Sequence, residues 1–151
     1  MRDMYSNIAA SLLILRGREA LSTSGGSTAD LAGYDSATIL IGVGGSGTTL
    51  AAASNVRVFV YHGDTSTEAT AAVSTSDLIG ATSTTGRVMN LTTPTLAQAA
   101  AGVTRIGYIG GKRHIGVKYF ASGSATGGTG AAGVQLTVVV VKGRPALSPV
   151  A

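Results

Sequence analysis

The fold class is decided by the stretch NVRVFVY at residues 55–61. Its valines alternate with Arg57, Phe59 and Tyr61, and successive side chains of a β-strand point to opposite faces. An α-helix would scatter these valines over several sides of its surface. The stretch therefore predicts a strand with one uniformly apolar face and one face that carries aromatic and cationic groups.

Other apolar or β-branched runs recur on both sides of this strand. They occupy residues 38–43, 87–91 and 134–142, and clusters of Gly, Ser, Thr and Asp separate them at residues 22–28, 63–67, 82–86 and 122–133. The run at 134–142 is β-branched on both faces, as expected of a strand between two layers. Helical patterns are confined to residues 95–101 and the first fifteen residues. Short strands with Gly-rich turns predict an all-β, antiparallel β-sandwich or jelly roll.

The chain of 151 residues has the length of one domain, and we expect a single β-sandwich domain over residues 1–151. Residues 1–16 are predicted to be an N-terminal arm or the first strand. Residues 143–151 are predicted to be an extended C-terminal tail, because Pro145 and Pro149 disfavour helix and lack backbone donors.

Residues 104–120 carry the clearest local signal. Two apolar runs flank Gly110 and Gly111, and a Gly-Gly pair suits the type I′ turn of a two-residue β-hairpin. This hairpin would place Ile106, Tyr108, Ile115, Val117 and Tyr119 on one face and Arg105, Lys112, His114 and Lys118 on the other. We predict the second face, together with Arg113, as a contact surface; an ordinary solvated face fits the same pattern equally well.

The composition excludes several classes of protein. The chain has no Cys, which removes disulfide scaffolds, thiolate zinc sites and cysteine nucleophiles. Charged residues make up only 12%, the net charge is +4, and the mean hydropathy is +0.34. So few charges on so apolar a chain indicate a subunit that completes its burial against a partner. No apolar run is long enough to predict a membrane-spanning helix.

Residues 42–47 match the dinucleotide-binding pattern G-x-G-x-x-G after a predicted strand, and Asp64 follows the next strand. A nucleotide site requires a long helix after the last glycine, and only residues 48–54 are available for it. A Gly-rich loop explains the pattern better. His62 and His114 with Asp64 lack the spacing of a metal site, and no nucleophile elbow is present. The sequence thus predicts no enzyme, no cofactor and no metal.

Nucleic acid is also disfavoured as a partner of the segment at 104–120. Proteins that bind single strands interleave cations with stacking aromatics. Here Tyr108 and Tyr119 fall on the face opposite most of the cations, so we expect them in the core, with Phe120 as the remaining aromatic.

Four segments together resemble the small auxiliary head proteins (capsid cement or decoration proteins) of tailed bacteriophages and phage-like particles. They are residues 1–8, 33–39, 107–113 and 143–151. The resemblance implies a β-sandwich or jelly-roll subunit in the virion, made in the cytoplasm of a bacterial host. Such a subunit binds the major capsid protein on the outer capsid surface and bridges capsomers, as a dimer or trimer. Acidic capsid exteriors would suit Arg105, Lys112, Arg113, His114 and Lys118.

Two other functions fit parts of the sequence. The Gly/Ser/Thr-rich loops also suit a secreted or surface β-sandwich binding module, such as an adhesin or a fibre head. A nucleotide-binding enzyme built on residues 42–47 is the third alternative.

Overall fold

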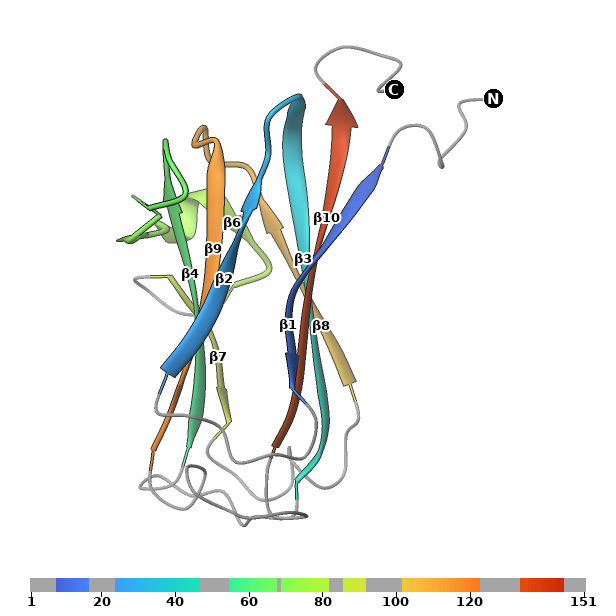
Figure 1. Ribbon diagram of the computed structural model, residues 1–151, viewed down its shortest axis with the longest axis vertical. Coiled ribbons are helices and arrows are strands. Elements are labelled where there is room, and N and C mark those ends of the chain that lie inside the picture. The colour runs from blue at the N-terminus through green and yellow to red at the C-terminus, as the bar shows by residue number, and fades with distance from the viewer. Residues whose placement is uncertain are drawn as a thin grey trace.

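The computed structural model describes residues 8–16, 24–46, 55–67, 69–81, 86–91, 102–122 and 134–145. Their strands form two five-stranded sheets that face each other (Figure 1). Sheet I has the order β1-β10-β3-β8-β6, and sheet II has the order β2-β9-β4-β5, with β7 also paired to β4. The strands are β1 (Ala9–Arg16), β2 (Ser24–Asp30), β3 (Tyr34–Ser46), β4 (Val56–Gly63), β5 (Ala71–Ala72), β6 (Leu78–Ile79), β7 (Arg87–Leu91), β8 (Gly102–Tyr108), β9 (His114–Ala121) and β10 (Val134–Pro145).

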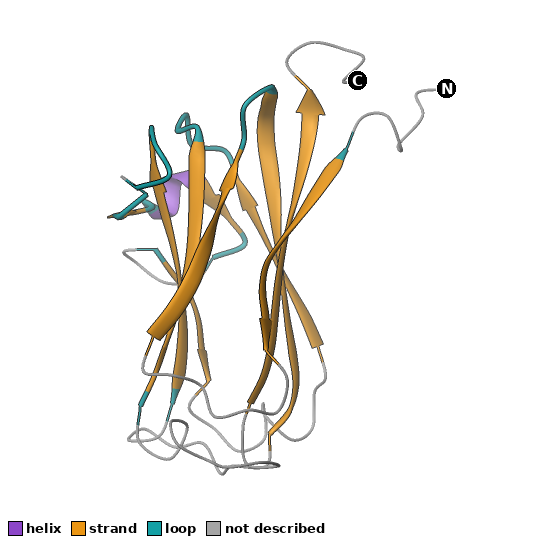
Figure 2. Ribbon diagram, in the orientation of Figure 1, coloured by secondary structure: helices purple, strands orange, loops and turns teal. Residues whose placement is uncertain are grey.

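The connectivity of the long strands is that of a jelly roll. The longer strands of sheet I follow the order β1-β10-β3-β8, and those of sheet II follow β2-β9-β4-β7, all antiparallel to their neighbours. The chain therefore changes sheet between most successive long strands, as the eight-strand jelly roll requires. The only described helical turn is the 3-10 turn η2 (Thr75–Asp77), and strands dominate Figure 2. The predicted all-β sandwich or jelly roll is confirmed.

The core lies between the two sheets and is filled by alternate residues of each long strand. Sheet II contributes the three valines of β4, all with no exposed surface, together with Ile115, Val117 and Tyr119 of β9. Sheet I contributes, among others, Ile39, Ile41, Ile106, Tyr108, Leu136, Val138 and Val140. The alternation at residues 55–61 thus predicted the buried face of β4 correctly.

Two local predictions are wrong, and a third is not tested by the structure. Residues 134–142 belong to β10, but only one face of this strand is buried, because its other face lies on the outside of sheet I. The predicted turn at 22–28 is largely β2, which pairs with β9 from Ser24 to Asp30. This pairing satisfies the backbone of a Gly/Ser/Thr-rich segment whose own strand propensity is weak. The predicted helix at 95–101 lies outside the described residues.

The N-terminal strand forms one edge of sheet I. β1 pairs with β10 from Ala9, opposite Lys142, to Arg16, opposite Leu136. The register shifts between Leu12 and Ile14, where Leu13 is the extra residue of a β-bulge. Within the described ranges, no helix is long and apolar enough to span a membrane.

The predicted hairpin at 104–120 is also wrong. β8 pairs with β3 and β6 in sheet I, whereas β9 pairs with β2 and β4 in sheet II. Gly110 and Gly111 therefore connect the two sheets, and neither has a positive φ. Both strands have one apolar face, and placing them in opposite sheets buries these faces against each other. The predicted apolar set from Ile106 to Tyr119 is in the core, as expected, but it comes from both sheets.

Candidate interaction surfaces

The outer face of sheet I is largely apolar. Register pairs align Leu12 of β1 with Val139 of β10, Leu40 of β3 and Arg105 of β8. Paired residues of neighbouring strands point to the same side of a sheet. A second row runs from Leu15 of β1 through Thr137 and Gly42 to Val103 of β8. We call these two rows, together with Ile79 of β6, the apolar face of sheet I.

Several members of this face are openly exposed. Leu12 is 57% exposed, Leu15 69%, Val103 66% and Ile79 60%. Arg105, also exposed, is the only charged residue in the two rows among the described side chains. Large contiguous apolar patches are rare on proteins that remain monomeric, and they mark interaction surfaces.

A second cluster, at one end of the sandwich, consists of paired charges. The Nε and Nη2 atoms of Arg113 donate to the two carboxylate oxygens of Asp30 at 3.0 and 2.7 Å. Lys112 Nζ donates to Asp64 at 2.7 Å. His114 places Nδ1 3.1 Å from the backbone oxygen of Asp64 and Nε2 3.8 Å from Asp30. The positive charges of Lys112 and Arg113 are thus balanced within the chain.

The bidentate pair shifts the titration of both of its members. The hydrogen bonds from Arg113, helped by the backbone N–H of Ala32, hold the pKa of Asp30 well below its usual range. The Asp30 carboxylate in turn raises the pKa of Arg113. The pair is therefore charged at neutral pH and joins β2 to the segment that precedes β9.

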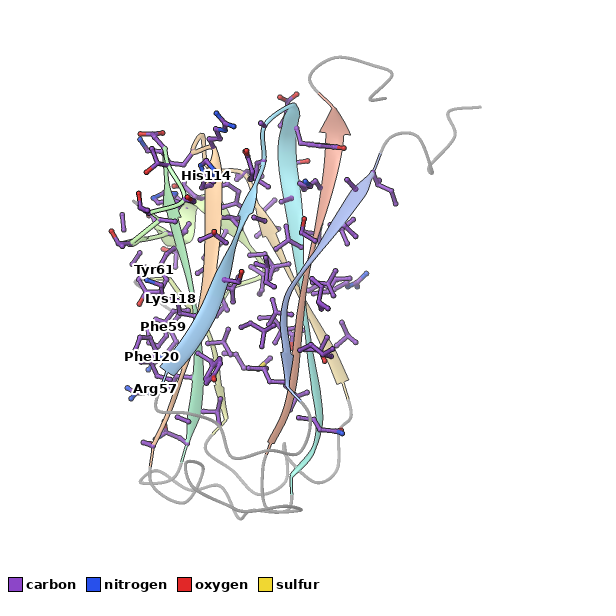
Figure 3. All side chains as sticks on the ribbon, in the orientation of Figure 1. Arg57, Phe59, Tyr61, His114, Lys118 and Phe120 are labelled. Carbon is purple, nitrogen blue, oxygen red and sulfur yellow. The ribbon has the colours of Figure 1, made fainter. Side chains whose placement is uncertain are left out.

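The outer face of sheet II carries the aromatic side of the alternation at residues 55–61. Arg57, Phe59 and Tyr61 of β4 lie beside Lys118 and Phe120 of β9, and all five point away from sheet I (Figure 3). Phe59 contacts Phe120 edge to face, with 5.4 Å between ring centres, and lies 6.3 Å from Tyr61. Lys118 Nζ lies 4.8 Å from the centre of the Tyr61 ring. We call these residues, with Arg87 of β7, the aromatic–cationic face.

The five predicted contact residues do not share one surface. Arg105 is on the apolar face of sheet I, whereas Lys118 is on the opposite side of the sandwich. Lys112, Arg113 and His114 form the paired charge cluster at one end. The predicted cationic face depended on the hairpin. Because β8 and β9 lie in different sheets, its residues lie on different sides of the molecule.

The dinucleotide pattern is part of a strand. Gly42 and Gly44 lie within β3, and Gly42 pairs with Thr137 and Val103. A Cβ atom on Gly44 would lie 2.7 Å from the Cβ of Gln135, so this glycine accommodates a side chain of β10. Neither glycine belongs to a strand-to-helix loop, which counts against the alternative of a nucleotide site. The Gly-rich loop expected here is also wrong, because β3 continues to Ser46. The segment at 48–54 lies outside the described residues.

The two histidines are held by different partners. His62 is half-buried, and its Nδ1 lies 3.1 Å from the hydroxyl of the buried Tyr108. His114 contacts Asp30 and Asp64 at the end of the sandwich. Among the described residues, no group of three or more His, Asp or Glu side chains is arranged to hold a metal ion.

Sequence reasoning missed the two outer faces as surfaces. The signal for the aromatic–cationic face was present in residues 55–61, but its companions Lys118 and Phe120 are distant in sequence. The apolar face of sheet I depends on the neighbour relations β1-β10-β3-β8, which no local pattern specifies.

The sequence matches no protein-family profile and no curated protein. Among solved structures, the chain is similar to the coat protein of tobacco streak virus, with 12% sequence identity and a TM-score of 0.38. The match covers 96% of this chain and 92% of that one. An identity this low does not transfer a function from one chain to the other.

Proposed function

We propose that this protein is a structural virion subunit, a cement protein that binds the outer surface of a capsid and bridges neighbouring capsomers. The observation that carries the proposal is the apolar face of sheet I. Leu12, Leu15, Val103 and Ile79 are all more than half exposed, and their burial requires a partner. We infer that this partner is the major capsid protein.

The fold and the sequence resemblance support the same role. Jelly rolls with this connectivity build viral capsid domains, although lectin domains and cupins share the fold. The four segments that resemble phage head proteins span most of the chain. Ala9 of β1 pairs with Lys142 of β10, so the first and the last described strands meet at one corner of sheet I. The predicted tail at 143–151 begins as a strand, because β10 continues to Pro145.

This docking mode selects among the predicted contact residues. Arg105 lies within the apolar face, so it is the cation that the capsid surface would cover. Lys112 and Arg113 are already paired with Asp64 and Asp30. We therefore propose that Arg105 provides the electrostatic part of capsid recognition and that Lys112, Arg113 and His114 are peripheral.

The test is co-sedimentation with empty capsids assembled from the major capsid protein of the same genome. Replacing Leu15 and Val103 by Ser should weaken binding by roughly tenfold or more for each buried side chain. Both side chains are exposed in the free subunit, so the substitutions should leave the fold intact. Bound parent protein should also raise the temperature at which the capsids disrupt.

Ile109 provides a matched control, because it is 55% exposed but lies in the connection between β8 and β9. Ile109→Ser should bind capsids like the parent. The proposal fails if the parent does not bind capsids, or if the Leu15 and Val103 variants bind as tightly as the parent.

A further inference from the structure

On the aromatic–cationic face, aromatic rings and cationic side chains lie side by side across three strands. Phe59 pairs with Lys118 of β9 on one side and with Arg87 of β7 on the other. In the next row, Arg57 pairs with Phe120. Aromatic and cationic side chains therefore alternate across the sheet.

The rings are supported by one another rather than by a covering layer. Phe120 meets Phe59 edge to face, and Lys118 lies over Tyr61. All three rings are half-buried, and all three side chains point away from sheet I (Figure 3). Contacts of this kind hold the rings in fixed positions, so a ligand that stacks on them meets a preformed surface.

The charge of this face is one-sided. Arg57 and Lys118 are cationic, and no carboxylate shares their register rows among the described residues. Asp30 and Asp64 lie at the other end of sheet II, where they bond Arg113 and Lys112. The face thus complements an anion.

Arg57 carries a polar atom whose hydrogen bonding is incomplete. Its Nε atom is buried and has no hydrogen-bond partner among the described residues. Buried donors are nearly always paired, so an unpaired one calls for an explanation such as an absent ion or water. A phosphate oxygen on this face is an acceptor that Arg57 would suit.

We propose that the aromatic–cationic face binds single-stranded nucleic acid. Unpaired bases stack on Phe59 and Phe120, and the phosphates contact Arg57 and Lys118. Stacking platforms flanked by cations are how proteins hold single strands with little sequence preference. The proposal reverses the expectation from residues 104–120, because the rings it uses come mainly from β4.

This inference does not rest on the proposed capsid function. The aromatic–cationic face and the apolar face of sheet I lie on opposite outer sides of the sandwich (Figure 1). A subunit docked through sheet I therefore keeps sheet II accessible. Each proposal has its own variants, so one can fail while the other holds.

The test is fluorescence anisotropy with a labelled oligothymidylate of about 15 nucleotides, a length within the range that one small β-domain covers. The full-length protein is titrated at several salt concentrations between about 50 and 200 mM. Phe59→Leu and Phe120→Leu keep apolar bulk but remove the ring, and each should weaken binding about tenfold, within the range found on losing one stacked base. Phe59→Tyr keeps a ring and should retain the parent affinity.

The charge variants test the other half of the site. Arg57→Gln and Lys118→Gln should each weaken binding and reduce the slope of log affinity against log salt by about 0.7, the value for one phosphate contact on a single strand. Arg105→Gln is the matched control, because it removes the same charge from the opposite side of the sandwich. It should leave both affinity and slope nearly unchanged. Circular dichroism confirms that each variant is folded.

Four results would overturn the proposal. The first is the absence of binding at the lowest salt concentration. The second is an equal loss for Arg105→Gln and Lys118→Gln, which would indicate general charge attraction. The third is duplex DNA binding as tightly as the single strand, since stacking needs unpaired bases. The fourth is full affinity in both leucine variants together with equal competition by a sulfated polysaccharide, which would identify an acidic glycan surface.

Discussion

The hydroxyl of Tyr108 lies 3.1 Å from Nδ1 of His62 and so joins β8 of sheet I to β4 of sheet II. It also accepts a hydrogen bond from the backbone N–H of Lys112 at 3.2 Å. The side chain is almost fully buried, and this burial raises the pKa of Tyr108. One phenol therefore connects the two sheets and fixes the segment that passes between them.

Tyr108→Phe should destabilise the protein by about 1–3 kcal/mol, because it leaves the backbone N–H of Lys112 and the ring of His62 without their partner. Urea unfolding followed by circular dichroism measures the change. Tyr34→Phe is the control, because the Tyr34 ring is half-exposed and lies against Lys142 at the surface. Its free energy of unfolding should stay within about 0.5 kcal/mol of the parent value. Equal effects of the two substitutions would contradict a structural role for the Tyr108 hydroxyl.

Gly110 and Gly111 should respond differently to alanine. A Cβ atom on Gly110 would lie 2.7 Å from the Tyr108 ring, whereas one on Gly111 would meet nothing within 4 Å. Gly110→Ala should therefore cost about 1–3 kcal/mol through overpacking, and Gly111→Ala should be nearly neutral. Thermal unfolding of the two variants measures this difference. A type I′ hairpin would instead strain both positions, by about 1–2 kcal/mol each, so equal losses would favour the hairpin.

Asp30 should make the stability depend on pH in the acidic range. Its pKa is lowered by Arg113 in the folded protein, so folding favours the carboxylate. The resulting stabilisation is complete above the ordinary aspartate pKa of about 3.9, and it is lost as the pH falls below that value. The pair is exposed, so the contribution should not exceed about 1 kcal/mol.

The measurement is the urea midpoint at several pH values from 7 to below 4. Asp30→Asn should lower the midpoint at pH 7 and reduce its fall on acidification. Asp35→Asn removes another exposed carboxylate, from β3, and should leave the parent's pH profile unchanged. An identical pH profile for the parent and Asp30→Asn would show that the pair does not contribute.

The isolated protein should associate with itself when no capsid is present. The apolar face of sheet I then remains exposed, and a second copy is the surface most readily available to cover it. Sedimentation velocity over a range of concentrations should show a dimer or trimer. Replacing Leu15 and Val103 together by Ser should shift the protein toward monomer, while Ile109→Ser sediments like the parent. A parent that remains monomeric at every concentration contradicts this prediction.

The fold class was predictable because short stretches of the sequence carry the pattern of β-strands. Alternation at residues 55–61 and β-branched runs at 38–43, 87–91 and 134–142 identified four of the long strands. β2 was not predictable in this way, since its Gly, Ser and Thr residues form a strand through pairing with β9 rather than through their own propensity.

The surfaces were less predictable than the strands, because they depend on which strands become neighbours. Local sequence favoured a hairpin around Gly110 and Gly111, and only the need to bury two apolar faces places β8 and β9 in different sheets. The predicted cationic face failed with the hairpin. The aromatic side of β4 was visible in sequence, but Lys118 and Phe120 reach it through a register set by tertiary structure.

The bulge at Leu13 affects whether further strands can be added at the edge of sheet I. β1 and β6 are the edge strands of sheet I, and a regular edge is a template on which another chain can add a strand. The shifted register between Leu12 and Ile14 interrupts this template on one side, and β6 contains only two residues on the other. Growth strand by strand is therefore disfavoured at both margins of sheet I. The association predicted above would use the outer face of this sheet instead of its edges.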